Sequence, residues 1–125
     1  MATESIIPIL KLDNFLISSP QIAIHDRIAV QYKDALLQKI AETKSKGLIL
    51  DISAIDVVDS FLVRVISDVA SAANVMGCHT VLTGMSPAVA ITLAEMDLQL
   101  KGVFTALDIG KSMKILQREE MRLRD

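Results

Sequence analysis

The stretch that decides the fold runs from residue 48 to residue 62 and reads LILDISAIDVVDSFL. Its first part, Leu48 to Ser53, is an almost continuous apolar run, which is typical of a central β-strand covered on both faces. Asp56 and Asp59 follow in an acidic turn, and Ser60 then opens a long pattern of apolar residues at helical spacing. The stretch therefore predicts a strand that leads through an acidic turn into a helix, with a hydroxyl in the first turn of that helix.

The rest of the chain repeats this alternation of strand and helix. The order of predicted elements is β-β-α-β-α-β-α-β-α, and strand–helix alternation predicts parallel pairing with right-handed crossovers. Only the first two strands are expected to pair as an antiparallel hairpin. The sequence thus predicts a single α/β domain over residues 1–125, with a mixed, mostly parallel sheet of about five strands and about four helices. Strands are predicted at 5–12, 15–24, 48–53, 80–83 and 103–107, and helices at 27–45, 60–76, 87–96 and from 108 or 109 onward.

Several residues mark the expected ends of these elements. Pro8 and Pro20 predict edge positions or a bulge in the first two strands, because proline cannot donate to a strand ladder. Asp26 is the expected N-cap of the first helix, and Gly47 is the expected glycine just beyond its end. Ser86 followed by proline predicts a capped start for the helix at 87–96.

Composition narrows the class of protein. Hydrophobic residues make up 51% of the chain and aromatic residues only 3%, so the core must be aliphatic. The mean hydropathy is high at +0.44, yet no apolar run approaches the roughly 18 residues of a membrane span. The surplus apolar surface predicts either a tightly covered sheet or a subunit interface. The net charge is −2 and no basic stripe is present, which argues against nucleic-acid binding. The single cysteine, Cys78, and the absence of a secretory pattern at the N-terminus predict a cytoplasmic protein in which this thiol is structural.

Chemical motifs of enzymes are scarce. No glycine-rich phosphate loop or nucleophile elbow occurs, and His25 and His79 stand apart from any ligand-like spacing. The carboxylates of Asp51, Asp56 and Asp59 could bind a divalent cation or share a proton, but turn and cap roles explain them more simply. We therefore expect no catalytic residue, no cofactor and no metal. The residues alone leave Ser60 with two interpretations, a helix-start residue or a hydroxyl that accepts a phosphoryl group.

A family resemblance bears on this choice. The segment Ile52 to Leu62, with Asp59-Ser60 in the place of a phosphorylatable Asp-Ser pair, resembles the phosphorylation segment of STAS domains, the anti-anti-sigma-factor fold. The resemblance extends over essentially the whole chain and includes residues 82–90, LTGMSPAVA. Freestanding anti-anti-sigma factors carry small residues after this pair, whereas Phe61 follows here. This departure favours the branch of the family that builds the bacterial stressosome.

The resemblance implies a function and a set of partners. It implies a non-enzymatic scaffold that co-assembles with larger STAS-bearing sensors, forms homodimers and higher assemblies, and sequesters a serine-protein kinase until Ser60 is phosphorylated. The implied kinase contact comprises Asp56, Asp59, Ser60, Phe61 and Arg64. Two alternatives stay open: a freestanding anti-anti-sigma factor that binds an anti-sigma kinase, and a STAS sensor that binds a small ligand.

Overall fold

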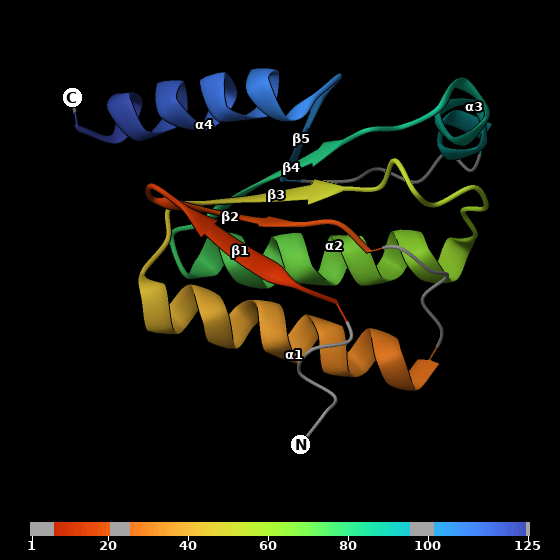
Figure 1. The fold of residues 1–125 in the computed structure, drawn as a ribbon, viewed down its shortest axis with the longest axis horizontal. Helices are drawn as coiled ribbons and strands as arrows, with labels where there is room; N and C mark the ends of the chain where they lie inside the picture. The colour runs from red at the N-terminus through yellow and green to blue at the C-terminus, as the bar shows by residue number, and fades with distance from the viewer. Residues whose placement is uncertain (1–6, 21–25, 96–101, 125) are drawn as a thin grey trace.

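The computed structural model describes residues 7–20, 26–95 and 102–124, and the predicted order of elements is confirmed over these residues (Figure 1). The first two strands are shorter than predicted, because residues 7–8 and 19–20 are described but belong to neither strand. The elements are β1 Ile9–Leu12, β2 Phe15–Ser18, α1 Asp26–Thr43, β3 Gly47–Asp51, α2 Ser60–Val75, β4 His79–Thr83, α3 Pro87–Glu95, β5 Val103–Ala106 and α4 Ile109–Arg124.

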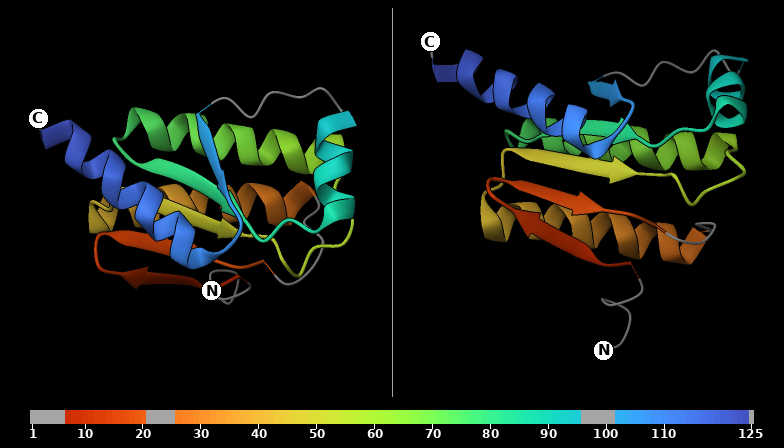
Figure 2. Two further views of the ribbon diagram at one scale, coloured as in Figure 1. Left: turned by 90° about the horizontal axis from the view of Figure 1, so that it is seen from above. Right: turned by 45° about the horizontal axis from the view of Figure 1, so that its top comes forward.

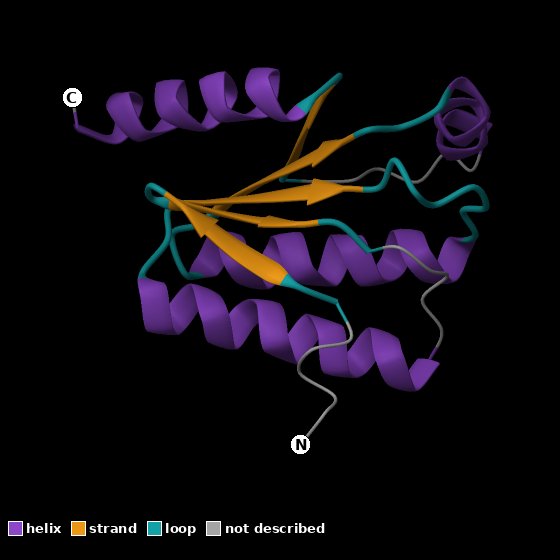
Figure 3. Ribbon diagram, viewed as in Figure 1, coloured by secondary structure: helices purple, strands orange, loops and turns teal. Residues whose placement is uncertain are grey.

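The five described strands form one sheet in the order β1-β2-β3-β4-β5 (Figure 3). β1 and β2 are antiparallel and are joined by the two-residue turn Asp13-Asn14, in which Asp13 adopts a φ of 55°. All other neighbours are parallel; Leu48, for example, lies opposite Leu16 on one side and Thr80 on the other. The predicted mixed sheet is therefore confirmed.

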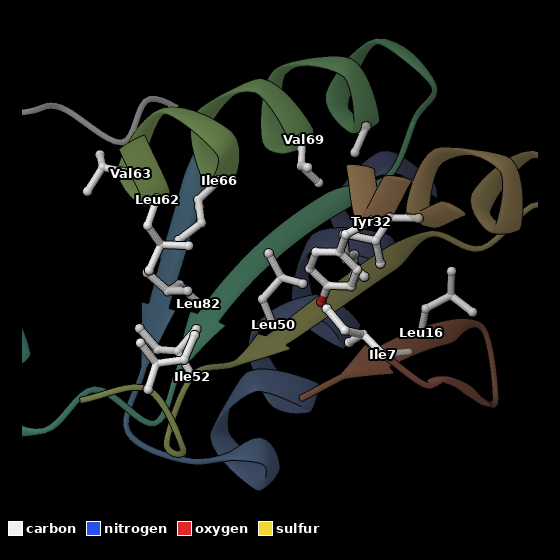
Figure 4. Packing of buried hydrophobic residues seen from close by; sticks show 14 of the residues in the cluster. Ile7, Leu16, Tyr32, Leu50, Ile52, Leu62, Val63, Ile66, Val69 and Leu82 are labelled. Atoms are coloured by element: carbon white, nitrogen blue, oxygen red, sulfur yellow. The ribbon is translucent and has the colours of Figure 1, made fainter. Parts of the chain in front are cut away.

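Helices cover both faces of this sheet. Views from two further directions show α1 and α2 on one face, α4 on the other, and α3 at the end where β3 and β4 finish (Figure 2). Alternate residues of β3 face opposite sides, so Leu48 and Leu50 join the core under α1 and α2, in which Leu50 is labelled in Figure 4. Ile49 instead packs with Leu116 of α4. This double coverage explains why the strand is apolar at every position from 48 to 50.

Gly47 has a different role from the predicted one. The prediction of a C-cap glycine is wrong, because α1 ends at Thr43 and Lys44 takes the left-handed conformation with a φ of 55°. Gly47 instead begins β3 under α4, where a Cβ atom would lie 2.5 Å from Leu116 Cδ1 and 2.9 Å from Phe15 Cδ1. The glycine is required by close packing against α4.

The two prolines have different outcomes. Pro8 directly precedes β1, which is an edge strand, so this prediction is confirmed. The edge or bulge predicted from Pro20 is wrong, since β2 pairs on both sides and ends at Ser18, before the proline. The part of the predicted second strand at 21–24 lies outside the described residues, as does His25.

Helical spacing in the sequence predicts that Val89, Ala90 and Ala94, together with Ala41 and Met76, lie on the inward faces of their helices. Val89 is buried as expected, but Ala90 and Ala94 on the same helix are exposed. Ala41 of α1 is also exposed, and Met76 is 42% exposed just after α2. These positions satisfy helical spacing, but no neighbouring element covers them.

Candidate functional site

The loop between β3 and α2 is anchored to the core by three buried apolar side chains. Ile52, Ile55 and Val58 are buried in the main core, and the Ile52 amide donates to the Thr83 carbonyl oxygen at 2.9 Å (Figure 4). The Ile55 amide donates to the Ile52 carbonyl oxygen at 3.0 Å, which closes a tight turn. The loop is therefore anchored at every third residue, and the residues between the anchors face outward.

Asp51 supports the start of this loop. Its Oδ1 accepts from the Ser53 amide at 3.0 Å, and its Oδ2 accepts from Ser19 Oγ at 3.4 Å. Gly84, which follows β4, has a φ of 82°, and a Cβ atom there would collide with Asp51 Oδ1 and lie 2.9 Å from the Ser53 amide nitrogen. Asp51 therefore stabilises the turn that follows β3, in agreement with the structural roles expected for these carboxylates.

Asp59, rather than Ser60, caps α2. The backbone of Asp59 is extended, with φ −121° and ψ 177°, and its Oδ1 accepts from the Leu62 amide at 2.9 Å. Such a cap contributes about 1 kcal/mol to helix stability. Ser60 is the first helical residue; its side chain is exposed, and its hydroxyl forms no hydrogen bond with any described residue. Asp59 thus supplies the N-cap of α2, and the Ser60 hydroxyl is not needed for it.

The other predicted contact residues surround Ser60. Asp56 and Asp59 are exposed in the loop, Arg64 is exposed one helical turn after Ser60, and Phe61 is half-buried. Residues i and i+4 share a helix face, so Arg64 lies on the same face as Ser60. No carboxylate of the described chain forms an ion pair with Arg64. The surface therefore combines a hydroxyl with two acidic side chains and one available guanidinium.

Sequence reasoning missed the apolar part of this surface. Val57 is 78% exposed between the buried anchors, and Ile91 is 58% exposed on α3, the helix that lies at the end of the sheet where β3 and β4 finish (Figure 2). Val58, next to Val57, is buried, so the two adjacent valines differ in exposure. The candidate surface around Ser60 thus includes the exposed aliphatic side chain of Val57, and α3 exposes a further one in Ile91.

The site is suited to receive negative charge at Ser60. The first amides of a helix point outward and its dipole is positive at this end, so an anion is stabilised there. The carboxylates of Asp56 and Asp59 repel such an anion, and this repulsion grows when a partner covers the surface and excludes water. Thr83, at the same end of the sheet, is only 1% exposed, and no described group accepts or donates a hydrogen bond at its hydroxyl. Ser60 is accordingly much more accessible to a modifying enzyme than Thr83.

The described residues contain neither a cluster of metal-binding side chains nor a helix that could span a membrane. Over residues 7–20, 26–95 and 102–124, no three His, Cys, Asp or Glu side chains come together in a way that could hold a metal ion. Among the helices of the same residues, none has the length and apolar content needed to cross a membrane.

Cys78 is expected to be unreactive in the folded protein. It is 1% exposed, and burial raises the pKa of its thiol from 9.0 to about 12, with Lys46 opposing the shift. Since only the thiolate is an effective nucleophile, Ellman's reagent at pH 8 should label the native chain very slowly and the urea-unfolded chain quickly. Rapid labelling of the native protein would contradict the buried placement.

Comparison with known proteins agrees with this architecture. The STAS domain family model matches residues 7–110. A serine-to-glutamate variant of RsbS from Moorella thermoacetica is 41% identical, with a TM-score of 0.80 over 92% of this chain and 97% of that chain. A chain in a structure of the stressosome, described as a signal integration and transduction hub, is 43% identical, with a TM-score of 0.78 over 90% of this chain and 98% of that one.

A curated relative is longer. The RsbT co-antagonist protein RsbRD of Bacillus subtilis (strain 168) is 26% identical over 80 residues, which are 64% of this chain but only 29% of that protein. The similarity therefore concerns a part of RsbRD. The match over residues 7–110 and the identity to RsbS over nearly the whole of both chains show that this chain belongs to the STAS domain family.

Proposed function

We propose that the chain is a stressosome scaffold that co-assembles with larger STAS-bearing sensors, sequesters a serine-protein kinase and releases it when Ser60 is phosphorylated. The similarity to RsbS and to a stressosome chain, each over about nine-tenths of this chain, supports the scaffold role. The similarity to part of the longer RsbRD supports larger STAS-bearing partners. In this proposal the chain works in the cytoplasm as a binding partner and a substrate, without a cofactor.

The choice of Ser60 as the phosphorylated residue rests mainly on one observation. Its hydroxyl is exposed at the first position of α2, while the capping bond that could have occupied it comes from Asp59. A kinase can therefore phosphorylate this hydroxyl without breaking a hydrogen bond that stabilises the fold. The proposed kinase contact consists of the residues around it: Asp56, Asp59, Ser60, Phe61 and Arg64.

The proposed release is electrostatic and needs no change of fold. A phosphate on Ser60 adds about −1.5 to −2 charges, which the start of the helix can accommodate. When a partner covers the surface, the repulsion between this group and the carboxylates of Asp56 and Asp59 is no longer screened by bulk water. For two unit charges about 4 Å apart the repulsion rises from about 1 to about 4 kcal/mol as the effective dielectric falls from about 80 to about 20. Phosphorylation thus opposes binding more strongly than it opposes folding.

Phosphate mapping tests this proposal. The cognate kinase and ATP should add a single phosphate to the peptide that contains Ser60, as read by mass spectrometry. Ser60→Ala should abolish incorporation, whereas the matched control Ser53→Ala, which removes an exposed hydroxyl from the same loop, should retain it. Phosphate on another peptide, or undiminished incorporation in the Ser60→Ala protein, would refute the assignment.

A further inference from the structure

The outward face of α2 carries three polar side chains in a row. Leu62 and Ile66 point from this helix into the core (Figure 4). Ser60, Arg64 and Asp68, which are spaced four residues apart, are exposed. Residues four positions apart on a helix are neighbours on one face, with Cβ atoms about 5–6 Å apart. Arg64 therefore lies one turn after a hydroxyl and one turn before a carboxylate.

Arg64 does not pair with this carboxylate. Within the described part of the chain, its guanidinium forms no ion pair with Asp68 or with any other acidic side chain. An acidic group four positions before a cation stabilises a helix more than one four positions after it, because the first arrangement agrees with the helix dipole. Asp68 has the less favourable arrangement. The more favourable position is that of Ser60, which carries no charge until it is modified.

The acidic residues of the loop before α2 do not take this position either. Asp59 precedes Arg64 by five residues, and its Oδ1 accepts from the Leu62 amide at 2.9 Å as the N-cap. Asp56 lies outside the helix, three residues farther back. In the unmodified chain the guanidinium is thus exposed and available to a partner that covers Ser60.

We propose that a phosphate on Ser60 pairs with Arg64 within α2 and thereby withdraws this guanidinium from the kinase. The inference rests on the proposed phosphorylation of Ser60 and adds the residue that receives the phosphate. A phosphate carries about −1.5 to −2 charges, and a guanidinium can donate two parallel hydrogen bonds to its oxygens. Exposed pairs of single charges contribute little to stability. The higher charge, the paired hydrogen bonds and the favourable helical spacing distinguish this pair from them.

Release of the kinase then has two components. Arg64 is the one basic residue of the proposed kinase contact, in which Asp56 and Asp59 are acidic. Before phosphorylation its guanidinium can attract an acidic group of the kinase. After phosphorylation the guanidinium is held by the phosphate, so this attraction is lost, and the phosphate adds its repulsion from the two carboxylates. Phosphorylation therefore removes an attraction as well as adding a repulsion.

The ionisation of the phosphate tests the pair directly. Phosphoserine incorporated at position 60 during translation makes this test independent of the kinase. The second pKa of phosphoserine is about 6 and can be followed by phosphorus NMR. A neighbouring guanidinium favours the doubly charged form, so Arg64→Gln should raise this pKa by at least about 0.3 pH units. Arg64→Lys keeps the charge but not the two parallel donors, and it should raise the pKa less.

A matched control removes an arginine from another helix. Arg118 is also exposed and forms no ion pair with a described residue, but it lies on α4, on the opposite face of the sheet (Figure 2). Arg118→Gln should change the pKa of the phosphate by less than about 0.1 pH unit, because solvent and salt screen distant surface charges. An unchanged pKa in Arg64→Gln, or an equal rise in both glutamine variants, would overturn the proposed pair.

Kinase affinity tests the withdrawal of Arg64. Arg64→Gln should weaken retention of the kinase by the unphosphorylated chain about fivefold. Phosphorylation should then cost this variant about fivefold less affinity than it costs the unchanged chain, because the attraction is already absent. Equal losses on phosphorylation in the two proteins would refute the withdrawal. Failure of the proposed switch itself gives a different result, since phosphorylation would then leave the affinity of the unchanged chain for the kinase unaltered, whatever the pKa of the phosphate.

Discussion

Ser60→Asp is expected to weaken retention of the kinase about a hundredfold without unfolding the protein. The added carboxylate joins Asp56 and Asp59 on one exposed surface. Covering that surface raises the repulsion between two charges about 4 Å apart by about 3 kcal/mol, which corresponds to roughly a hundredfold in affinity. The free energy of unfolding should change by less than about 1 kcal/mol, because the helix start favours an anion while Asp59 opposes it. Titration calorimetry with the kinase and urea unfolding measure the two effects.

Two variants separate charge from position in this experiment. Ser71→Asp adds the same charge to an exposed position farther along α2 and should leave kinase affinity within about twofold, because solvent screens isolated surface charges. Ser60→Asn alters the shape at the site without adding charge and should retain most of the affinity. A large loss of stability in Ser60→Asp would show instead that Ser60 is structural. Equal weakening by Ser71→Asp would exclude a local effect.

Gly84→Ala is expected to lower the free energy of unfolding by about 3 kcal/mol. Two costs combine: a left-handed backbone, with φ 82°, and a new methyl group directed against Asp51 Oδ1 and the Ser53 amide. The left-handed conformation costs an alanine about 1–2 kcal/mol and overpacking about 1–3 kcal/mol. Because the methyl displaces Asp51, it should also loosen the loop that carries Asp56 and Asp59. Urea unfolding measures the first effect, and hydrogen exchange over residues 52–59 the second.

Gly77 provides the matched control. It has the same φ of 82°, but a Cβ atom there would have no heavy atom within 4 Å. Gly77→Ala should therefore cost only the backbone term, about 1 kcal/mol, and leave exchange in the loop unchanged. If the two alanine variants were equally destabilised, close packing at Gly84 would contribute nothing and the proposed link to the loop would be wrong.

The alternation of elements and the start of α2 were predictable because they depend on neighbouring residues. Hydrophobic periodicity distinguishes strand from helix within a short window. The cap at Asp59 needs only the amide three residues later, so a strand, a turn and a capped helix could be placed around Ser60 from residues 48–62 alone. The exposure of Ser60 follows from its position at the first helical residue, once Asp59 supplies the cap.

Positions whose roles depend on distant segments were predicted less well. Gly47 fitted a helix end in the sequence, but its small size is explained by Leu116, which is 69 positions later and packs against it across the sheet. Val57 and Val58 are alike in the sequence, and only the packed loop shows that Val57 is exposed and Val58 buried. Exposure of this kind depends on which elements come to lie nearby, and a local pattern does not contain that information.

By itself, the sequence determined the α/β class, the order of elements and the hydroxyl at the start of α2, since each depends on contacts within a few residues. Only the tertiary structure decided that Asp51 and Gly84 support the loop from below, and that β1 presents an open edge with uncovered leucines. The physical reason is that strand order and helix coverage arise from contacts between segments far apart in the chain, and these contacts determine which apolar residues become core and which become surface.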